Sequence, residues 1–153
     1  MIILLYGQPA SGKTTLSNKL KVMLAPQNII QIDGDKWRDI TKNKDYSKEG
    51  RNRNLKGAFD MALYLEREGF VPILSFVTPY EEYRKYLANN SERFVEIYLF
   101  YNEDEDRGRN MNFAQDFEKP TTNFLSLNTS LYNVDQCVNE ILQYLGYQIY
   151  RTK

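Results

Sequence analysis

Hydrophobic residues gather in five short runs of strand length along the chain. The runs are Ile2–Tyr6, Ile29–Ile32, Val71–Phe76, Phe94–Phe100 and Phe124–Leu127. Between most of them, apolar residues recur at the three- and four-residue spacing of a helix. Because the strands of a parallel sheet are buried on both faces, apolar runs that alternate with helices are typical of such a sheet. The pattern therefore predicts an α/β fold with a five-stranded parallel sheet flanked by helices.

Three of the intervening stretches predict particular helices, each with an apolar stripe that faces the sheet. The first helix should stop before Pro26, and Gly69 and Gly146 are placed to end the other two. Asn133 is suited to cap the start of the third. The three stripes consist of Leu16, Leu20, Met23 and Leu24, of Leu55, Ala58, Phe59, Ala62 and Leu65, and of Val134, Val138, Ile141, Leu142 and Leu145.

The stretch from Tyr101 to Asn123 breaks this alternation, since it is polar and rich in acidic residues. Taken alone, it predicts a solvated loop or a short exposed helix. Connections of this length are often functional lids, so residues 101–123 are the candidate lid.

Composition narrows the chemistry. The chain has 153 residues, which favours a single domain over residues 1–153. Lys plus Arg and Asp plus Glu both number 20, and this zero net charge argues against a long nucleic-acid partner. The sequence holds 0 His, which excludes a Ser-His-Asp triad and leaves proton transfer to carboxylates or lysine. The lone Cys137 and the absence of a membrane span or signal peptide favour a cytoplasmic protein.

Residues 7–14 read Gly-Gln-Pro-Ala-Ser-Gly-Lys-Thr and match the phosphate-binding pattern G-x-x-x-x-G-K-[ST] in full. The match follows a predicted strand and precedes a predicted helix, which disfavours a plain glycine-rich turn. In such a loop, backbone N–H groups surround the phosphates, the lysine reaches the β- and γ-phosphates and the threonine hydroxyl ligates Mg²⁺. The predicted ATP-binding residues of this loop are Gly7, Ala10, Ser11, Gly12, Lys13, Thr14 and Thr15.

Two aspartates, in the sequence Asp33-Gly34-Asp35, close the second predicted strand. The carboxyl ends of parallel strands border the ligand crevice, so both carboxylates can face the phosphate loop. We expect Asp35 to accept the proton of an attacking hydroxyl and Asp33 to hold Mg²⁺, directly or through water, although the two roles could be exchanged. The predicted catalytic residues are thus Lys13, Asp33 and Asp35.

The guanine-reading signature of GTPases is absent. Such a protein needs an Asn-Lys-x-Asp segment, and in Asn43-Lys44-Asp45-Tyr46 the aspartate comes one place early. An Asp-x-x-Gly segment for a γ-phosphate switch is missing as well. A guanine-nucleotide switch is therefore not expected.

Together, these segments and several later ones resemble the adenylylsulfate (APS) kinase family, whose members use MgATP to phosphorylate the 3′-hydroxyl of adenosine 5′-phosphosulfate. The resemblance runs from residue 2 to about residue 145 and implies a three-layer P-loop kinase fold with a short lid. Beyond the phosphate loop it rests on Asp33–Arg38, Tyr46–Asn54, Ser75–Tyr80, Arg84, Phe94–Leu99 and Asp116–Pro120.

The resemblance also implies roles for individual residues. Arg38, Arg51 and Asn54 would hold the phosphosulfate and ribose, while Tyr46 and Phe113 would clamp the adenine and Phe76 would lie beside the substrate. Arg107 and Arg109 resemble lid arginines that cover ATP. Taken without the family, the charged residues fit a solvated surface and the aromatic ones fit the core equally well.

Three departures from the family pattern bear on the substrate. The lid segment is shorter than usual, Lys56-Gly57 replaces a frequent pair of arginines, and Gly50 replaces an acidic residue. The change at Lys56-Gly57 removes fork-type donors suited to an anionic acceptor, and the three departures together put APS itself in question. Other small acceptors, namely a nucleoside, a nucleotide or a polynucleotide end, therefore stay open as alternatives.

The leading hypothesis is an ATP-dependent, Mg²⁺-requiring kinase that converts APS to PAPS in sulfate assimilation. ATP and APS are the expected partners, without a membrane, and the oligomeric state is left open, a homodimer included. A nucleotide-binding module without catalysis is disfavoured because Asp33 and Asp35 accompany Lys13.

Overall fold

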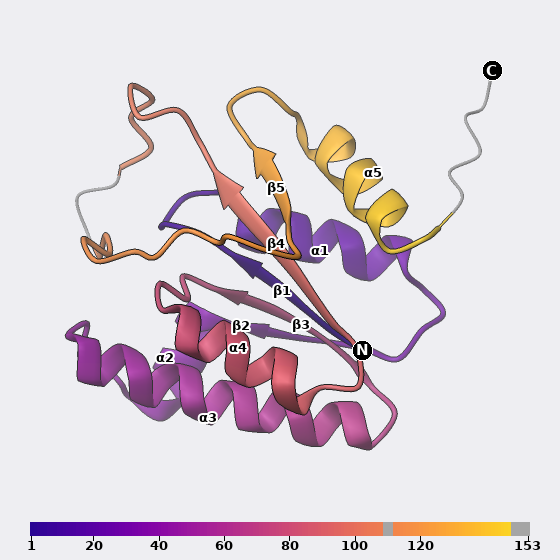
Figure 1. Ribbon diagram of the computed structural model, residues 1–153, viewed down its shortest axis with the longest axis horizontal. Helices are drawn as coiled ribbons and strands as arrows, with labels where there is room; N and C mark the ends of the chain where they lie inside the picture. Colours follow the sequence, from indigo (N-terminus) through magenta and orange to yellow (C-terminus); the bar gives the residue numbers. More distant parts are fainter. Residues whose placement is uncertain (109–111, 148–153) are drawn as a thin grey trace.

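The computed structural model describes residues 1–108 and 112–147 and contains a sheet of five parallel strands in the order β2-β3-β1-β4-β5. The predicted α/β fold is thereby confirmed. Helices lie on both sides of the sheet, α1 and α5 on one and α2, α3 and α4 on the other (Figure 1). The elements are β1 (Ile2–Tyr6), α1 (Lys13–Met23), β2 (Ile29–Asp33), α2 (Gly34–Thr41), α3 (Lys48–Arg67), β3 (Val71–Phe76), α4 (Glu81–Asn90), β4 (Phe94–Phe100), β5 (Leu125–Asn128) and α5 (Val134–Tyr144).

The central strand β1 is fully buried and divides the core into two parts. Side chains alternate along a strand, so Ile3 and Leu5 pack with α1 and α5 while Ile2, Leu4 and Tyr6 pack with α3 and α4. Burial of both faces explains why the run contains no charged residue and why its one polar side-chain atom, the Tyr6 hydroxyl, is hydrogen-bonded to Glu96. The same arrangement places the carboxyl ends of β1, β2 and β3 at one edge of the sheet.

Several predicted strand and helix positions need correction. The last strand lies one residue later than predicted, at Leu125–Asn128. Met23 and Val134, which were assigned to apolar stripes, are 50% and 40% exposed because they lie at helix ends, and Leu65 is only partly buried. Asp33 ends β2 and caps α2, a helix that was not predicted; α2 begins at Gly34, and none of its residues is buried.

The described part of the candidate lid forms no helix or strand between residues 101 and 123, which corrects the alternative of a short exposed helix. It is not simply solvated either, because Tyr101 and Ala114 are buried. Gln8 joins it to the phosphate loop, since its side chain donates to the Ala114 carbonyl at 2.7 Å and accepts from the Ala114 N–H at 3.0 Å. Within the described ranges, no helix has the length and apolar content needed to cross a membrane.

Candidate active site

The phosphate loop is shaped by glycines where β1 passes into α1. Gly7 has a φ of 152°, and a Cβ there would come within 2.0 Å of the Leu99 carbonyl oxygen. No other residue fits that close approach of two strands. Gly12 precedes α1 in a left-handed conformation, with a φ of 98°. The loop thus leads directly into a helix N-terminus, where an anion is stabilised by free N–H groups and the helix dipole.

Lys13 points back into this loop. Its ammonium donates to the carbonyls of Gly7 and Gln8 at 3.1 and 2.8 Å and to the Ser11 hydroxyl at 3.3 Å. Burial lowers the pKa of Lys13 to about 8, although the nearby carboxylates of Asp35 and Asp33 act to raise it. A buried cation that lacks a full countercharge is suited to bind a phosphate, which would supply that charge.

Thr14 and Asp33 meet across the end of the sheet, because the Thr14 hydroxyl donates to Asp33 Oδ2 at 2.7 Å. Asp33 Oδ1 accepts from the N–H groups of Asp35 and Lys36 and so caps α2. A hydroxyl and a carboxylate held beside a phosphate loop are hard oxygen donors of the kind that Mg²⁺ prefers. The predicted metal residues therefore lie together and fit that ion.

Next to these groups lies a cavity of about 390 Å³. Its volume lies within the range of small-molecule sites. One side is formed by the phosphate loop, including Ala10, Gly12, Lys13, Thr14 and Thr15, and continues to Asp33 and Asp35. The other side carries Arg38, Tyr46, Arg51, Asn54 and Phe76, together with Thr78, Pro79 and Asn112.

Arg38 and Tyr46 form a stacked pair in the cavity wall. The Arg38 guanidinium lies 4.1 Å from the centre of the Tyr46 ring. It also donates to the carbonyls of Asn43 and Asp45, at 3.2 and 2.9 Å. Burial lowers the pKa of Arg38 from its usual value. The arginine therefore both shapes the loop before α3 and presents positive charge to the cavity.

Arg51 and Asn54 lie one turn apart in α3, and both are at least nine-tenths buried. Arg51 donates to the carbonyls of Tyr46 and Asn112, at 3.0 and 2.9 Å. The side-chain oxygen of Asn54 is buried without a partner among the described residues. An unpaired polar atom in a cavity wall is expected to bind a donor of the ligand, because leaving it unpaired costs free energy.

Several predicted residues do not line the cavity. Gly7 and Ser11 lie behind the loop surface, and Phe113 is partly buried elsewhere. Arg107 donates to the Ala10 carbonyl at 3.2 Å and to the Thr129 carbonyl at 3.0 Å, so it braces the phosphate loop from outside. Arg109 lies outside the described residues. Phe76 is both a core residue and a cavity residue, because its side chain is 2% exposed and it also lines the cavity.

Sequence reasoning missed the contacts of Gln8 and Asn112 with partners distant along the chain, and the cavity-lining position of Thr78 and Pro79. The position of Thr78 and Pro79 could have been predicted, because they follow β3 at the carboxyl end of the sheet, where ligands bind in open α/β folds. Gln8 carried no signal because its position in the loop pattern accepts any residue.

Comparison with known proteins places these features in a family. The model of the family described as adenylylsulphate kinase matches residues 1–112. A probable adenylyl-sulfate kinase of Archaeoglobus fulgidus is 35% identical over 63% of this chain and 64% of its own length. A cytidine diphosphoramidate kinase of Campylobacter jejuni is 34% identical over 64% of this chain and 59% of its own length. The chain thus spans less than two thirds of these relatives.

Among solved structures, the Mycobacterium tuberculosis APS kinase in complex with AMPPNP and APS covers 95% of this chain and 97% of its own, with a TM-score of 0.79 and 18% identity. That likeness shows the P-loop kinase fold. Because the family model matches well over half of the 153 residues, this chain belongs to the adenylylsulphate kinase family.

Proposed function

We propose that the protein transfers the γ-phosphoryl group of ATP to the 3′-hydroxyl of APS, giving PAPS and ADP. The observation that carries this proposal is that one cavity is lined both by the phosphate loop and by two arginines and an aromatic ring, Arg38, Arg51 and Tyr46. A phosphoryl donor and an anionic acceptor nucleotide need such walls opposite each other. Membership of the adenylylsulphate kinase family supports the same acceptor.

In this mechanism, Lys13 exchanges its loop carbonyls for the oxygens of the β- and γ-phosphates and stabilises charge on the group in transfer. Thr14 and Asp33 would hold Mg²⁺, which supplies further neutralisation of phosphate charge when it is bound. Both oxygens of Asp33 already accept hydrogen bonds. This engagement favours Asp33 for the metal and leaves proton acceptance to Asp35.

Asp35 suits that role because it lies in the first turn of α2 and lines the cavity. Among the described residues, no side chain donates a hydrogen bond to its carboxylate. The protein has 0 His, so a carboxylate is the available acceptor for the proton of the attacking hydroxyl.

At the proposed acceptor site, Arg38 and Arg51 would bind the phosphosulfate group, and the Tyr46 ring would stack on the adenine of the acceptor. Arginine suits this site because its planar guanidinium can bind oxyanions and can also stack on the Tyr46 ring, as Arg38 does. Asn54, with its unpaired buried oxygen, would accept from a ribose hydroxyl.

A second candidate is a kinase of the same type that acts on another nucleotide acceptor. The Campylobacter jejuni cytidine diphosphoramidate kinase is as similar to this chain as the Archaeoglobus relative is, which favours this alternative. Lys56, one of the two residues that replace the family's frequent pair of arginines, does not line the cavity. Its Nζ instead lies 2.6 Å from Asp60 Oδ2. Gly57 packs beside the Trp37 ring and contributes no charge.

A coupled assay of ADP release with MgATP tests both candidates against a panel of APS, cytidine nucleotides, nucleosides and 5′-hydroxyl oligonucleotides. APS should give the highest kcat/KM. Arg51→Ala should raise the KM of the acceptor about tenfold or more without changing that of ATP. Arg53→Ala is the matched control, because Arg53 lies on the same helix, is 65% exposed and is outside this cavity.

A rate with another acceptor but none with APS would refute the substrate assignment and retain the kinase. If no acceptor gives a rate of ADP release above that with water, both kinase proposals are refuted and a non-catalytic nucleotide-binding module is the remaining hypothesis. Equal effects of Arg51→Ala and Arg53→Ala would remove Arg51 from the acceptor site.

A further inference from the structure

A charged side chain lies fully buried behind Thr78 and Pro79. These two residues belong to the acceptor wall, by which we mean the cavity-lining residues proposed to bind the acceptor: Arg38, Tyr46, Arg51, Asn54, Phe76, Thr78, Pro79 and Asn112. Arg84 of α4 is 2% exposed, and its Nε lies 3.1 Å from Glu96 Oε1 on β4. The Tyr6 hydroxyl donates to the same oxygen at 2.6 Å. Arginine is rarely buried unless it is paired, and an apolar residue at this helix position would fill the core without that cost. The position of Arg84 therefore calls for an explanation beyond packing.

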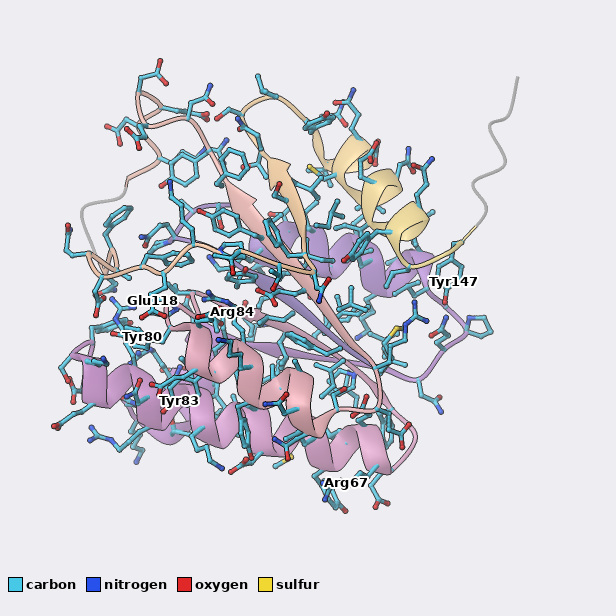
Figure 2. The ribbon with its side chains drawn as sticks, viewed as in Figure 1. Arg67, Tyr80, Tyr83, Arg84, Glu118 and Tyr147 are labelled. Carbon is cyan, nitrogen blue, oxygen red and sulfur yellow. The ribbon has the colours of Figure 1, made fainter. Side chains whose placement is uncertain are left out.

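The remaining contacts of Arg84 hold backbone. Its Nη1 donates to the Thr78 carbonyl at 3.0 Å, and its Nη2 donates to the Glu118 carbonyl at 2.8 Å. Figure 2 shows Arg84 beside Glu118, with Tyr80 close to both. The Glu118 N–H in turn donates to the Pro79 carbonyl at 2.8 Å. One guanidinium thus joins β4, the loop after β3 and the segment that returns from the candidate lid.

Thr78, one of the residues held in this way, has strained backbone. Its φ is 44°, in the left-handed region that a β-branched residue rarely adopts. It is fully buried, its hydroxyl has no partner among the described residues, and it lines the cavity. Such strain persists only where the surrounding structure enforces it, and it concentrates at functional sites.

We propose that Arg84 is a positioning residue for the acceptor. By holding the carbonyls of Thr78 and Glu118, it fixes the cavity wall at residues 78–79 in the conformation that binds the acceptor nucleotide. The proposal rests on the kinase function proposed above, and its effect is confined to the acceptor. Within the described residues, the polar contacts of Arg84 go to Thr78, Glu118 and Glu96 and none goes to residues 7–14, so we expect ATP binding to be kept.

Arg84→Lys tests the proposal, because it keeps the charge beside Glu96 and loses the fork that reaches two carbonyls. We expect the KM of the acceptor to rise about tenfold or more, with the KM of ATP within about twofold of the wild type. The matched control is Glu66→Gln. Like Arg84, Glu66 is buried and belongs to an ion pair. Its Oε1 lies 2.6 Å from the Met1 amino group, next to the start of β1 and away from the cavity. This variant should lower stability and leave both KM values unchanged.

A double variant covers the case in which Arg84→Lys does not fold. Arg84→Met with Glu96→Gln removes both buried charges, which proteins often tolerate, and should give the same rise in acceptor KM. An unchanged acceptor KM in either folded variant would overturn the proposal. So would a rise in both KM values, or a rise of the same size in Glu66→Gln.

Hydrogen exchange separates this proposal from the kinase function. The amides of Thr78, Tyr80 and residues 116–118 should exchange faster in Arg84→Lys, while those of the phosphate loop other than Pro9 keep their wild-type rates. If the wild type phosphorylates nothing in the panel but the exchange changes appear, the kinase proposal fails and the positioning contacts stand. Unchanged exchange at Thr78 and Tyr80 would overturn the positioning role by itself.

Discussion

The paired hydrogen bonds between Gln8 and Ala114 should make residue 8 a determinant of stability. Gln8 donates to the Ala114 carbonyl at 2.7 Å and accepts from its N–H at 3.0 Å, across 106 residues of sequence. Gln8→Glu keeps the size of the side chain but replaces the donor by a carboxylate oxygen that faces the carbonyl. Ala114 is 3% exposed, so water cannot easily replace the lost bond.

The expected loss follows from these contacts. A net hydrogen bond contributes about 1 kcal/mol, and leaving a buried carbonyl unpaired costs about 1–3 kcal/mol more. We therefore expect Gln8→Glu to lower the free energy of unfolding by about 2–4 kcal/mol. In a domain of this size, that loss lowers Tm by roughly 4–16 °C. Below about pH 4 the deficit should shrink, because a protonated carboxyl can donate again.

Urea and thermal unfolding without nucleotide measure this effect. Gln115→Glu is the matched control, since Gln115 is exposed and next to Ala114. It makes the same chemical change and should stay within about 0.5 kcal/mol of the wild type. If Gln8→Glu is as stable as Gln115→Glu, the two hydrogen bonds do not hold the lid segment to the phosphate loop, and the reasoning fails.

Three further predictions concern the phosphate loop, the proton acceptor and the core. The lowered pKa of Lys13, about 8, means that the lysine loses its charge as pH rises through 8, so ATP affinity should fall above that pH. Isothermal titration calorimetry should show that fall together with proton uptake, and both should vanish in Lys13→Arg, which stays charged. Asp35→Asn should lower kcat by about 10²–10⁴ with ATP binding retained, and an unchanged kcat in the ADP-release assay would exclude Asp35 as proton acceptor. Leu4→Ala, in fully buried β1, should cost about 2–5 kcal/mol in urea unfolding, whereas a loss below 1 kcal/mol would contradict the assigned packing.

The sequence was most informative where structure is local. The phosphate loop could be predicted because its pattern specifies a strand, a tight glycine turn and a helix in succession. The closeness of Thr14 and Asp33 was also predictable in outline, since parallel strands bring their carboxyl ends to one edge.

The elements that escaped prediction lack the usual hydrophobic signal. Helix α2 has no fully buried residue, so no apolar stripe marks it. Helix α4 buries only Arg84 and Leu87, and a charged residue at the inward position conceals its amphipathic pattern. The contacts that complete the acceptor wall join residues far apart in sequence, such as Arg51 and Asn112, and no spacing rule encodes them.

The cavity has a half formed by the phosphate loop and a half proposed to bind the acceptor, and the ligand-binding groups of the first half are easier to predict from the sequence. In the phosphate half, donors that serve the ligand come from one continuous loop. In the acceptor half, Arg38 and Arg51 already use part of their donor capacity to hold the carbonyls of Asp45, Tyr46 and Asn112. Each guanidinium carries five N–H groups, so some remain for an oxyanion. A ligand that binds there therefore meets a wall whose shape depends on the same arginines, which links acceptor choice to the conformation of the loops around α3. If the proposed acceptor site is correct, substitutions in these loops would change acceptor choice while the phosphate loop stays the same.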